Sequence, residues 1–160
     1  MNRTTALVGS AAQTLRRVVI GRVSPEVDGG RFAAKRTLGD VVRVTADIFA
    51  DGHEQLGAVL RYRAAEEKGD WREEEMKLVE NDRWEGRFRV DLLGRYLFTL
   101  AGWVDEFKTW ATDFEKRVSA GQDVSVDARI GLEILGRVAE RASGRDKQEL
   151  AAAAARVKTE

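Results

Sequence analysis

Apolar and charged side chains alternate along residues 82–105, and this stretch organises the rest of the chain. Arginine and glutamate separate its first apolar positions, which are Trp84, Gly86, Phe88 and Val90. A period of two with one apolar side predicts a half-buried β-strand. After a short turn the alternation resumes at Tyr96, Phe98 and Leu100, which predicts a second strand.

The turn between these two strands carries the spacing Leu92-x-Gly94-x-Tyr96. It resembles a tyrosine corner, in which a tyrosine at the start of a sandwich strand bonds to the backbone before it. The pair of strands therefore predicts the last strands of an immunoglobulin-like β-sandwich.

Four further segments upstream have strand patterns and are separated by glycine- and aspartate-containing turns. They are residues 17–23, 40–49, 58–65 and 71–79, with a possible short edge segment at 32–35. Their predicted inward positions are Val42, Val44, Ala46, Ile48, Leu60, Tyr62, Ala64, Met76 and Leu78. Pro25 ends the first strand, because proline cannot donate to a β-ladder. Strands at this spacing favour a mainly β sandwich over an α/β fold.

The hydrophobic period changes after Trp103 to the spacing of helices. Phe107, Trp110, Phe114 and Val118 share one face of a predicted helix that stops near Gly121. Asp113 and Arg117 are expected to pair on this helix. Helices are also predicted over 126–142 and 145–158, although the alternation from 124 to 130 is compatible with a strand. The organisation is thus an extension (1–16), a sandwich (17–110) and a C-terminal helical segment (111–160).

The strand that follows Arg95 has apolar residues on both faces. Leu97, Ala101 and Trp103 stand opposite the inward set and are predicted to form an interface. A strand that is apolar on both sides needs a cover. The C-terminal helices, another domain or another subunit could supply it.

Composition excludes several classes of partner. The chain has 160 residues, with 27 basic and 27 acidic side chains and no cysteine. Without a basic excess we expect no nucleic acid and no membrane surface as a partner. No stretch approaches the roughly 20 apolar residues of a membrane span, so a cytoplasmic location is expected.

No set of residues in the sequence forms a recognisable catalytic or metal site. His53, the single histidine, lies in a turn and is predicted to be an exposed loop residue. The run Glu73-Glu74-Glu75 is predicted to be a solvated edge strand, because consecutive strand residues point to opposite faces. We therefore predict no catalytic residue, no metal and no cofactor.

Tryptophan offers the one candidate for ligand binding, because sugars stack on exposed aromatic faces. Trp84 and Trp110 are predicted to be packing residues, and Trp103 an interface residue. Trp71 begins a strand next to Gly69 and Asp70, so it is the predicted sugar platform.

Several segments, in the same order along the chain, resemble the N-terminal domain of the α-1,4-glucan:maltose-1-phosphate maltosyltransferases. These are bacterial glycogen-pathway enzymes of the α-amylase type. The similar segments are residues 19–51, 60–63, 81–88, 94–110 and 115–124, within a region of similarity from about 17 to 140. Ala33 stands where family members often have proline.

This resemblance implies an immunoglobulin-like domain that precedes a catalytic TIM barrel and helps to form a homodimer. The enzymes transfer maltosyl units from maltose phosphate to α-glucan, and their catalytic carboxylates lie on the barrel. None of the barrel's motifs is present in this chain. The expected function is therefore a non-catalytic domain for dimerisation and barrel support; the alternative is a stand-alone α-glucan-binding module.

Overall fold

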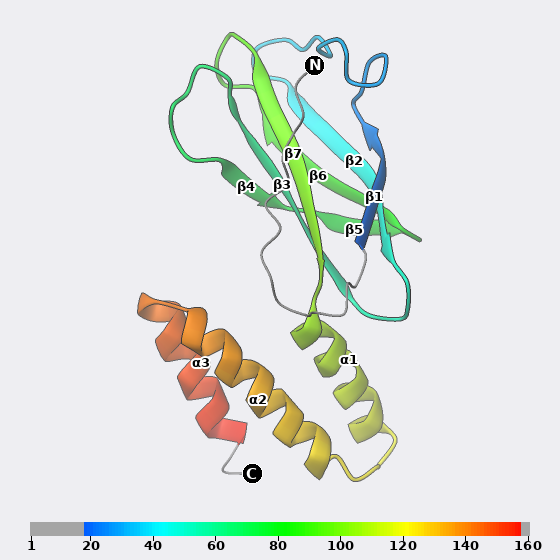
Figure 1. The fold of residues 1–160 in the computed structure, drawn as a ribbon, viewed down its shortest axis with the longest axis vertical. Helices are drawn as coiled ribbons and strands as arrows, with labels where there is room; N and C mark the ends of the chain where they lie inside the picture. Colours follow the sequence, from blue (N-terminus) through cyan, green and yellow to red (C-terminus); the bar gives the residue numbers. More distant parts are fainter. Residues whose placement is uncertain (1–17, 158–160) are drawn as a thin grey trace, which may run out of the picture.

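The computed structural model describes residues 18–157, which form a β-sandwich followed by three helices (Figure 1). The predicted extension over 1–16 lies outside these residues. The strands are β1 (Val18–Ser24), β2 (Val41–Ala50), β3 (Leu56–Ala64), β4 (Arg72–Glu75), β5 (Lys77–Glu80), β6 (Arg83–Arg89) and β7 (Tyr96–Val104). The helices are α1 (Glu106–Ser119), α2 (Ser125–Arg141) and α3 (Gly144–Val157). The mainly β sandwich with a C-terminal helical segment is confirmed.

Two antiparallel sheets face each other in the sandwich. One has four strands in the order β1-β2-β6-β5, and the other has three in the order β4-β3-β7. The two strands of residues 82–105 are thus β6 and β7, and they belong to different sheets. Each forms hydrogen bonds with a strand far away in the sequence: β6 pairs with β2, and β7 pairs with β3.

The core consists of most of the predicted inward positions of both sheets together with Ala58, while the predicted Ala64 and Leu78 lie outside it. Its buried apolar members are Val42, Val44, Ala46, Ile48, Ala58, Leu60, Met76, Trp84, Phe88 and Val90. Burial of a large apolar side chain stabilises the fold by about 1.5–3 kcal/mol. Gly86 has a packing role here, because a Cβ on it would lie 3.1 Å from Met76 and 3.2 Å from Leu60. The glycine lets the two sheets approach each other.

The predicted tyrosine corner forms between β6 and β7. The hydroxyl oxygen of Tyr96 accepts hydrogen bonds from the backbone N–H groups of Asp91 (3.2 Å) and Leu92 (3.0 Å). These bonds hold the turn against the first residue of β7.

The predicted single strand over 71–79 is wrong. The chain changes sheets at Met76, so β4 lies in the three-stranded sheet and β5 in the four-stranded sheet. Met76 is 1% exposed, as predicted for an inward residue, but Leu78 is 55% exposed. Leu78 belongs to β5, the outer strand of the four-stranded sheet, and lies opposite Trp84 of β6. At this outer position the three-stranded sheet does not cover Leu78. The segment 32–35 likewise forms no strand beyond a single bridge between Phe32 and Val27.

The helices begin where the periodicity changes, and the strand alternative for 124–130 is excluded. The carboxylate of Asp105 caps α1 by accepting a hydrogen bond from the N–H of Lys108 (2.8 Å). Helix α1 therefore begins at Glu106 and includes Phe107 and Trp110, as the helical spacing predicted. The predicted pair of Asp113 and Arg117 is wrong: Asp113 pairs with Lys116 (3.4 Å), and Arg117 reaches Asp127 of α2 (2.5 Å).

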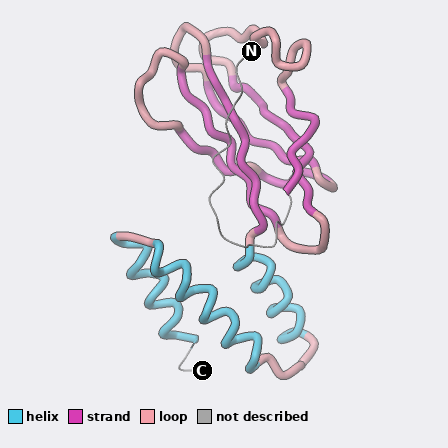
Figure 2. The backbone as a smooth tube through the Cα atoms, viewed as in Figure 1, coloured by secondary structure: helices cyan, strands magenta, loops and turns pink. Residues whose placement is uncertain are grey.

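The C-terminal helices do not cover the outer face of β7. They extend beyond one end of the sandwich, and α2 and α3 pack against each other there (Figures 1 and 2). Trp110 packs between α1 and α2, as predicted, and its Nε1 atom donates to the carbonyl of Asp127 (2.7 Å).

Candidate interaction surface

The outer face of the three-stranded sheet brings together the candidate residues from the sequence. Opposite residues of antiparallel strands share a face. Trp103 lies opposite Gly57, Ala101 opposite Val59, Thr99 opposite Arg61, and Leu97 opposite Arg63. On the other side of β3, Glu75 lies opposite Val59 and Glu73 opposite Arg61. We call this the β7 face.

The three predicted interface residues lie along the β7 face and are open to solvent to different degrees. Leu97 is 38% exposed, Trp103 is 46% exposed, and Ala101 is half-buried. Exposed large apolar side chains on one sheet face are candidates for a surface that another molecule covers.

Trp103 lies flat against the sheet because its opposite residue has no side chain. A Cβ atom on Gly57 would lie 2.6 Å from the indole ring, closer than any real contact. One face of the ring therefore rests on the backbone of β3, while the rest of the ring remains accessible. This placement needs both residues, since any side chain at position 57 would displace the tryptophan.

A groove of about 670 Å³ opens beside Trp103 at the end of the sandwich nearest α1. Its lining combines aromatic, carboxylate and amide groups, including Trp84, Trp103, Glu75, Asn81 and Asp82. This is the type of lining that small polar ligands use, with an apolar platform and a few hydrogen-bonding groups.

Trp71 is less accessible than its sequence context suggests. Its side chain is half-buried, and the guanidinium carbon of Arg63 lies 4.8 Å from the centre of its ring. This geometry is a cation–π contact. The Nε atom of Arg63 is buried without a hydrogen-bond partner in the described part of the chain. One face of the predicted sugar platform is therefore already occupied.

Trp71 stacks on Arg63, which lies on the β7 face, and an ion pair between Arg61 and Glu73 (2.7 Å) lies between this end of the face and Trp103. Both side chains are about half exposed, so the pair contributes little to stability. It makes the middle of the face polar.

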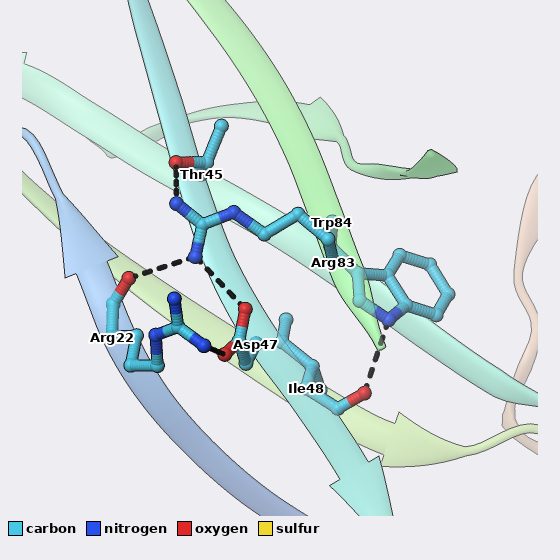
Figure 3. A network of polar contacts seen from close by, with 6 residues as sticks. All are labelled: Arg22, Thr45, Asp47, Ile48, Arg83 and Trp84. Carbon is cyan, nitrogen blue, oxygen red and sulfur yellow. Dashed lines mark hydrogen bonds and ion pairs between the residues drawn. The ribbon is translucent and has the colours of Figure 1, made fainter. Parts of the chain in front are cut away.

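The outer face of the four-stranded sheet is different, because its charges satisfy one another (Figure 3). Arg83 donates to the Asp47 carboxylate (2.8 Å), to the Thr45 hydroxyl (2.6 Å) and to the carbonyl of Arg22 (3.1 Å). Arg22 also pairs with Asp47 (3.2 Å). From the opposite side of β6, Trp84 donates to the carbonyl of Ile48 (3.1 Å). Because these charged groups already bond to one another, few of them are free to bind a partner.

Glu85 lies on the same polar face between two arginines. Its carboxylate accepts hydrogen bonds from Arg87 (2.7 Å) and from Arg43. The hydrogen bond from Arg87, followed by that from Arg43, lowers the pKa of Glu85 below its ordinary value despite partial desolvation.

The remaining candidate residues from the sequence are His53 and the run of three glutamates, two of which (Glu73 and Glu75) lie on the β7 face. His53 is exposed in the turn after β2, as predicted, and β4 with its three glutamates is an outer strand. Within residues 18–157 no cluster of histidine, aspartate and glutamate is arranged to hold a metal ion. None of the described helices is long and apolar enough to cross a membrane.

Comparison with known proteins places this fold in context. Residues 16–160 match the family described as "Alpha-1,4-glucan:maltose-1-phosphate maltosyltransferase, domain N/S". An α-1,4-glucan:maltose-1-phosphate maltosyltransferase of Chlorobaculum tepidum is 48% identical over 131 residues, which are 82% of this chain and 19% of the relative. Its namesake in Myxococcus xanthus is 41% identical over 133 residues, which are 81% of this chain and 20% of the relative. The chain thus spans about a fifth of the length of these relatives.

Proposed function

The chain belongs to the family of N/S domains of the α-1,4-glucan:maltose-1-phosphate maltosyltransferases, and we propose that it is a non-catalytic interaction module. In this proposal the immunoglobulin-like sandwich holds together two copies of a cytoplasmic enzyme that transfers maltosyl units from maltose phosphate to α-glucan. It also supports the enzyme's catalytic barrel.

The β7 face carries this proposal. Leu97 and Trp103 expose large apolar areas on a rigid sheet, and the chain's own helices extend beyond the end of the sandwich. A sheet is a suitable support for an interface, because its backbone changes little on binding.

Light scattering on the isolated chain tests the dimer. We expect the mass of a dimer for the unaltered chain and of a monomer for Leu97→Asp, because a buried unpaired carboxylate is costly. Leu93→Asp is the matched control, since Leu93 is 86% exposed in the turn before β7 and away from the face. A monomer of the unaltered chain at high concentration would overturn the dimer proposal.

An α-glucan-binding module is the second candidate, and Trp103 favours it. The ring is 46% exposed and borders a groove with carboxylate and amide groups, which suits a sugar ring with its apolar face and hydroxyl rim. Trp71, the platform predicted from the sequence, remains the competing position, although Arg63 already stacks on its ring.

Calorimetric titration with a linear malto-oligosaccharide decides between the candidates. Under the glucan proposal, binding is saturable and is lost in Trp103→Ala, with the mass of the protein unchanged. If binding is lost in Trp71→Ala but kept in Trp103→Ala, Trp71 is the sugar platform, as the sequence predicted. Under the interface proposal there is no binding heat, and Trp103→Ala weakens the dimer.

A further inference from the structure

The backbone of β7 has one edge without a strand partner in the described chain. β7 is the last strand of its sheet, and among residues 18–157 it pairs only with β3. Ala65 donates to the carbonyl of Arg95 (2.7 Å), and Asp105 donates to that of Gln55 (2.8 Å), at the two ends of this pairing. Hydrogen-bonded residues alternate along an antiparallel ladder. The backbone N–H and C=O groups of the odd-numbered residues of β7 therefore point toward β3. Those of Tyr96, Phe98 and Leu100 point to the free edge.

The C-terminal half of β7 packs against the four-stranded sheet. A Cβ on Gly102 would lie 3.2 Å from Val18 of β1 and 3.1 Å from Ile48 of β2, so the two sheets meet there. The N-terminal half of β7 instead borders a groove of about 890 Å³. Its walls are the start of β7, including Tyr96 and Phe98, and the loop of residues 25–36. Unpaired backbone groups of a strand edge thus border a cavity large enough for a short peptide.

The rim of this groove is basic, although the whole chain has equal numbers of acidic and basic residues. Arg31, Lys35, Arg36 and Arg95 line it, against one acidic residue, Glu26. Arg31 pairs with Asp28 (3.4 Å), while Lys35 and Arg95 have no ion-pair partner within residues 18–157. An excess of one sign in a concave surface attracts ligands of the opposite charge.

The floor of the groove is apolar and aromatic. Val42, Phe88 and Val90 are buried core residues at its base, and Phe32 is 62% exposed in the loop that forms one wall. A small inorganic anion would use the basic rim and leave this floor and the strand edge unused. An extended peptide with alternating apolar and acidic residues would use all three.

We propose that the free edge of β7 binds an extended acidic segment of a partner polypeptide, which adds to the sheet as an antiparallel strand. Recognition of a peptide by strand addition combines main-chain hydrogen bonds with pockets for alternate side chains. Residues opposite Tyr96 and Phe98 share their inward face, so the apolar side chains of the segment enter the groove. Its carboxylates then lie on the other face, on the side of Arg95.

Calorimetric titration of the whole chain with a capped peptide, (Glu-Val)4, tests the proposal. We expect saturable binding, no binding of (Lys-Val)4, and loss of binding when the valine nitrogens are methylated, because they donate to the edge of β7. Methylation of the glutamate nitrogens is the matched control and should change the affinity little. Equal losses from both methylated peptides, or competition by inorganic phosphate alone, would reduce the site to a general anion surface and overturn strand addition.

Amide hydrogen exchange supplies a readout that charge attraction alone would not change. The amides of Tyr96 and Phe98 should exchange rapidly in the free protein and at least about tenfold more slowly with bound peptide. Unchanged exchange at both amides would refute the proposal.

Charge reversal then tests the rim. Arg95→Glu and Lys35→Glu should each weaken binding of (Glu-Val)4 about tenfold. Lys68→Glu, in the exposed turn after β3, should not. Equal effects at all three positions would count against a specific site. These measurements are independent of the dimer mass, so this inference and the dimer proposal can fail separately.

Discussion

The indole ring of Trp110 lies directly over Gly131, so closely that a Cβ atom on the glycine would stand 2.1 Å from the ring. This contact joins α1 to α2. The centre of the Trp110 ring also lies 5.4 Å from that of Phe107, in a tilted arrangement, and 5.1 Å from that of Phe114, in a stacked one. It explains why Gly131 is buried in the middle of a helix, where glycine is intrinsically unfavourable.

Gly131→Ala is expected to destabilise the helical segment by about 1–3 kcal/mol, because the added methyl group forces the two helices apart. Gly136→Ala in the same helix is the matched control. A Cβ there meets nothing within 4 Å, so it should stabilise by about 0.5–1 kcal/mol through helix propensity. Thermal unfolding followed by far-UV circular dichroism measures both. Equal effects of the two substitutions would show that the contact is not close.

Tyr96→Phe should lower the free energy of unfolding by about 0.5–1.5 kcal/mol, because two backbone N–H groups lose their acceptor. Tyr62→Phe provides the control, since the Tyr62 ring stacks on Phe88 (4.5 Å) but its hydroxyl has no hydrogen bond within residues 18–157. Its effect should stay within about 0.5 kcal/mol. Urea denaturation compares the two, and a larger loss from the Tyr62 substitution would contradict the role of the corner.

Asp47→Ala should destabilise the sandwich by about 1–3 kcal/mol. It leaves Arg83 and Arg22 without their shared carboxylate, and the Asp47 side chain is only 20% exposed. Asp113→Ala removes an ion pair whose carboxylate is 58% exposed, so it should cost less than about 0.5 kcal/mol. Chemical denaturation tests the difference; similar values would mean that the pairs of Figure 3 are as weak as ordinary surface pairs.

Glu85 should make stability fall in acid. Its pKa is lower in the folded protein than the ordinary value of 4.5, mainly because of the hydrogen bond from Arg87. A lowered carboxylate pKa stabilises the fold above the unfolded-state pKa, and this stabilisation is lost as pH falls through the folded-state pKa. Glu85→Gln should therefore flatten the loss of stability below about pH 4.5. Thermal melts from pH 6 to 3 measure how stability depends on pH. If the unaltered protein and Glu85→Gln lose stability equally over this range, Glu85 is not the cause.

The strands could be predicted from the sequence because side chains in a strand alternate between two environments. Val44 and Leu60 are fully buried on the predicted side, and Tyr96 makes the bonds that its spacing predicted. The change of sheet at Met76 could not be predicted. Alternation continues through the crossing, so Leu78 has an inward pattern but an exposed position.

The candidate surface could be predicted only in part. The doubly apolar pattern of β7 identified Leu97 and Trp103 as outward residues, and both are exposed. The roles of the tryptophans depend on neighbours from other strands: Arg63 covers the ring of Trp71, and Gly57 supports that of Trp103. Finding these neighbours requires knowing which residues lie opposite each tryptophan, and the sequence alone does not give this strand register.

The sequence by itself determined most of the strands and helices, most of the core side chains and the family of the chain, because these follow from local periodicity and motif order. Only the tertiary structure decided which strands are neighbours and which edge of β7 has no strand partner in the described part of the chain. Those features depend on contacts between residues far apart in the chain, such as β3 with β7, and local patterns carry no information about them.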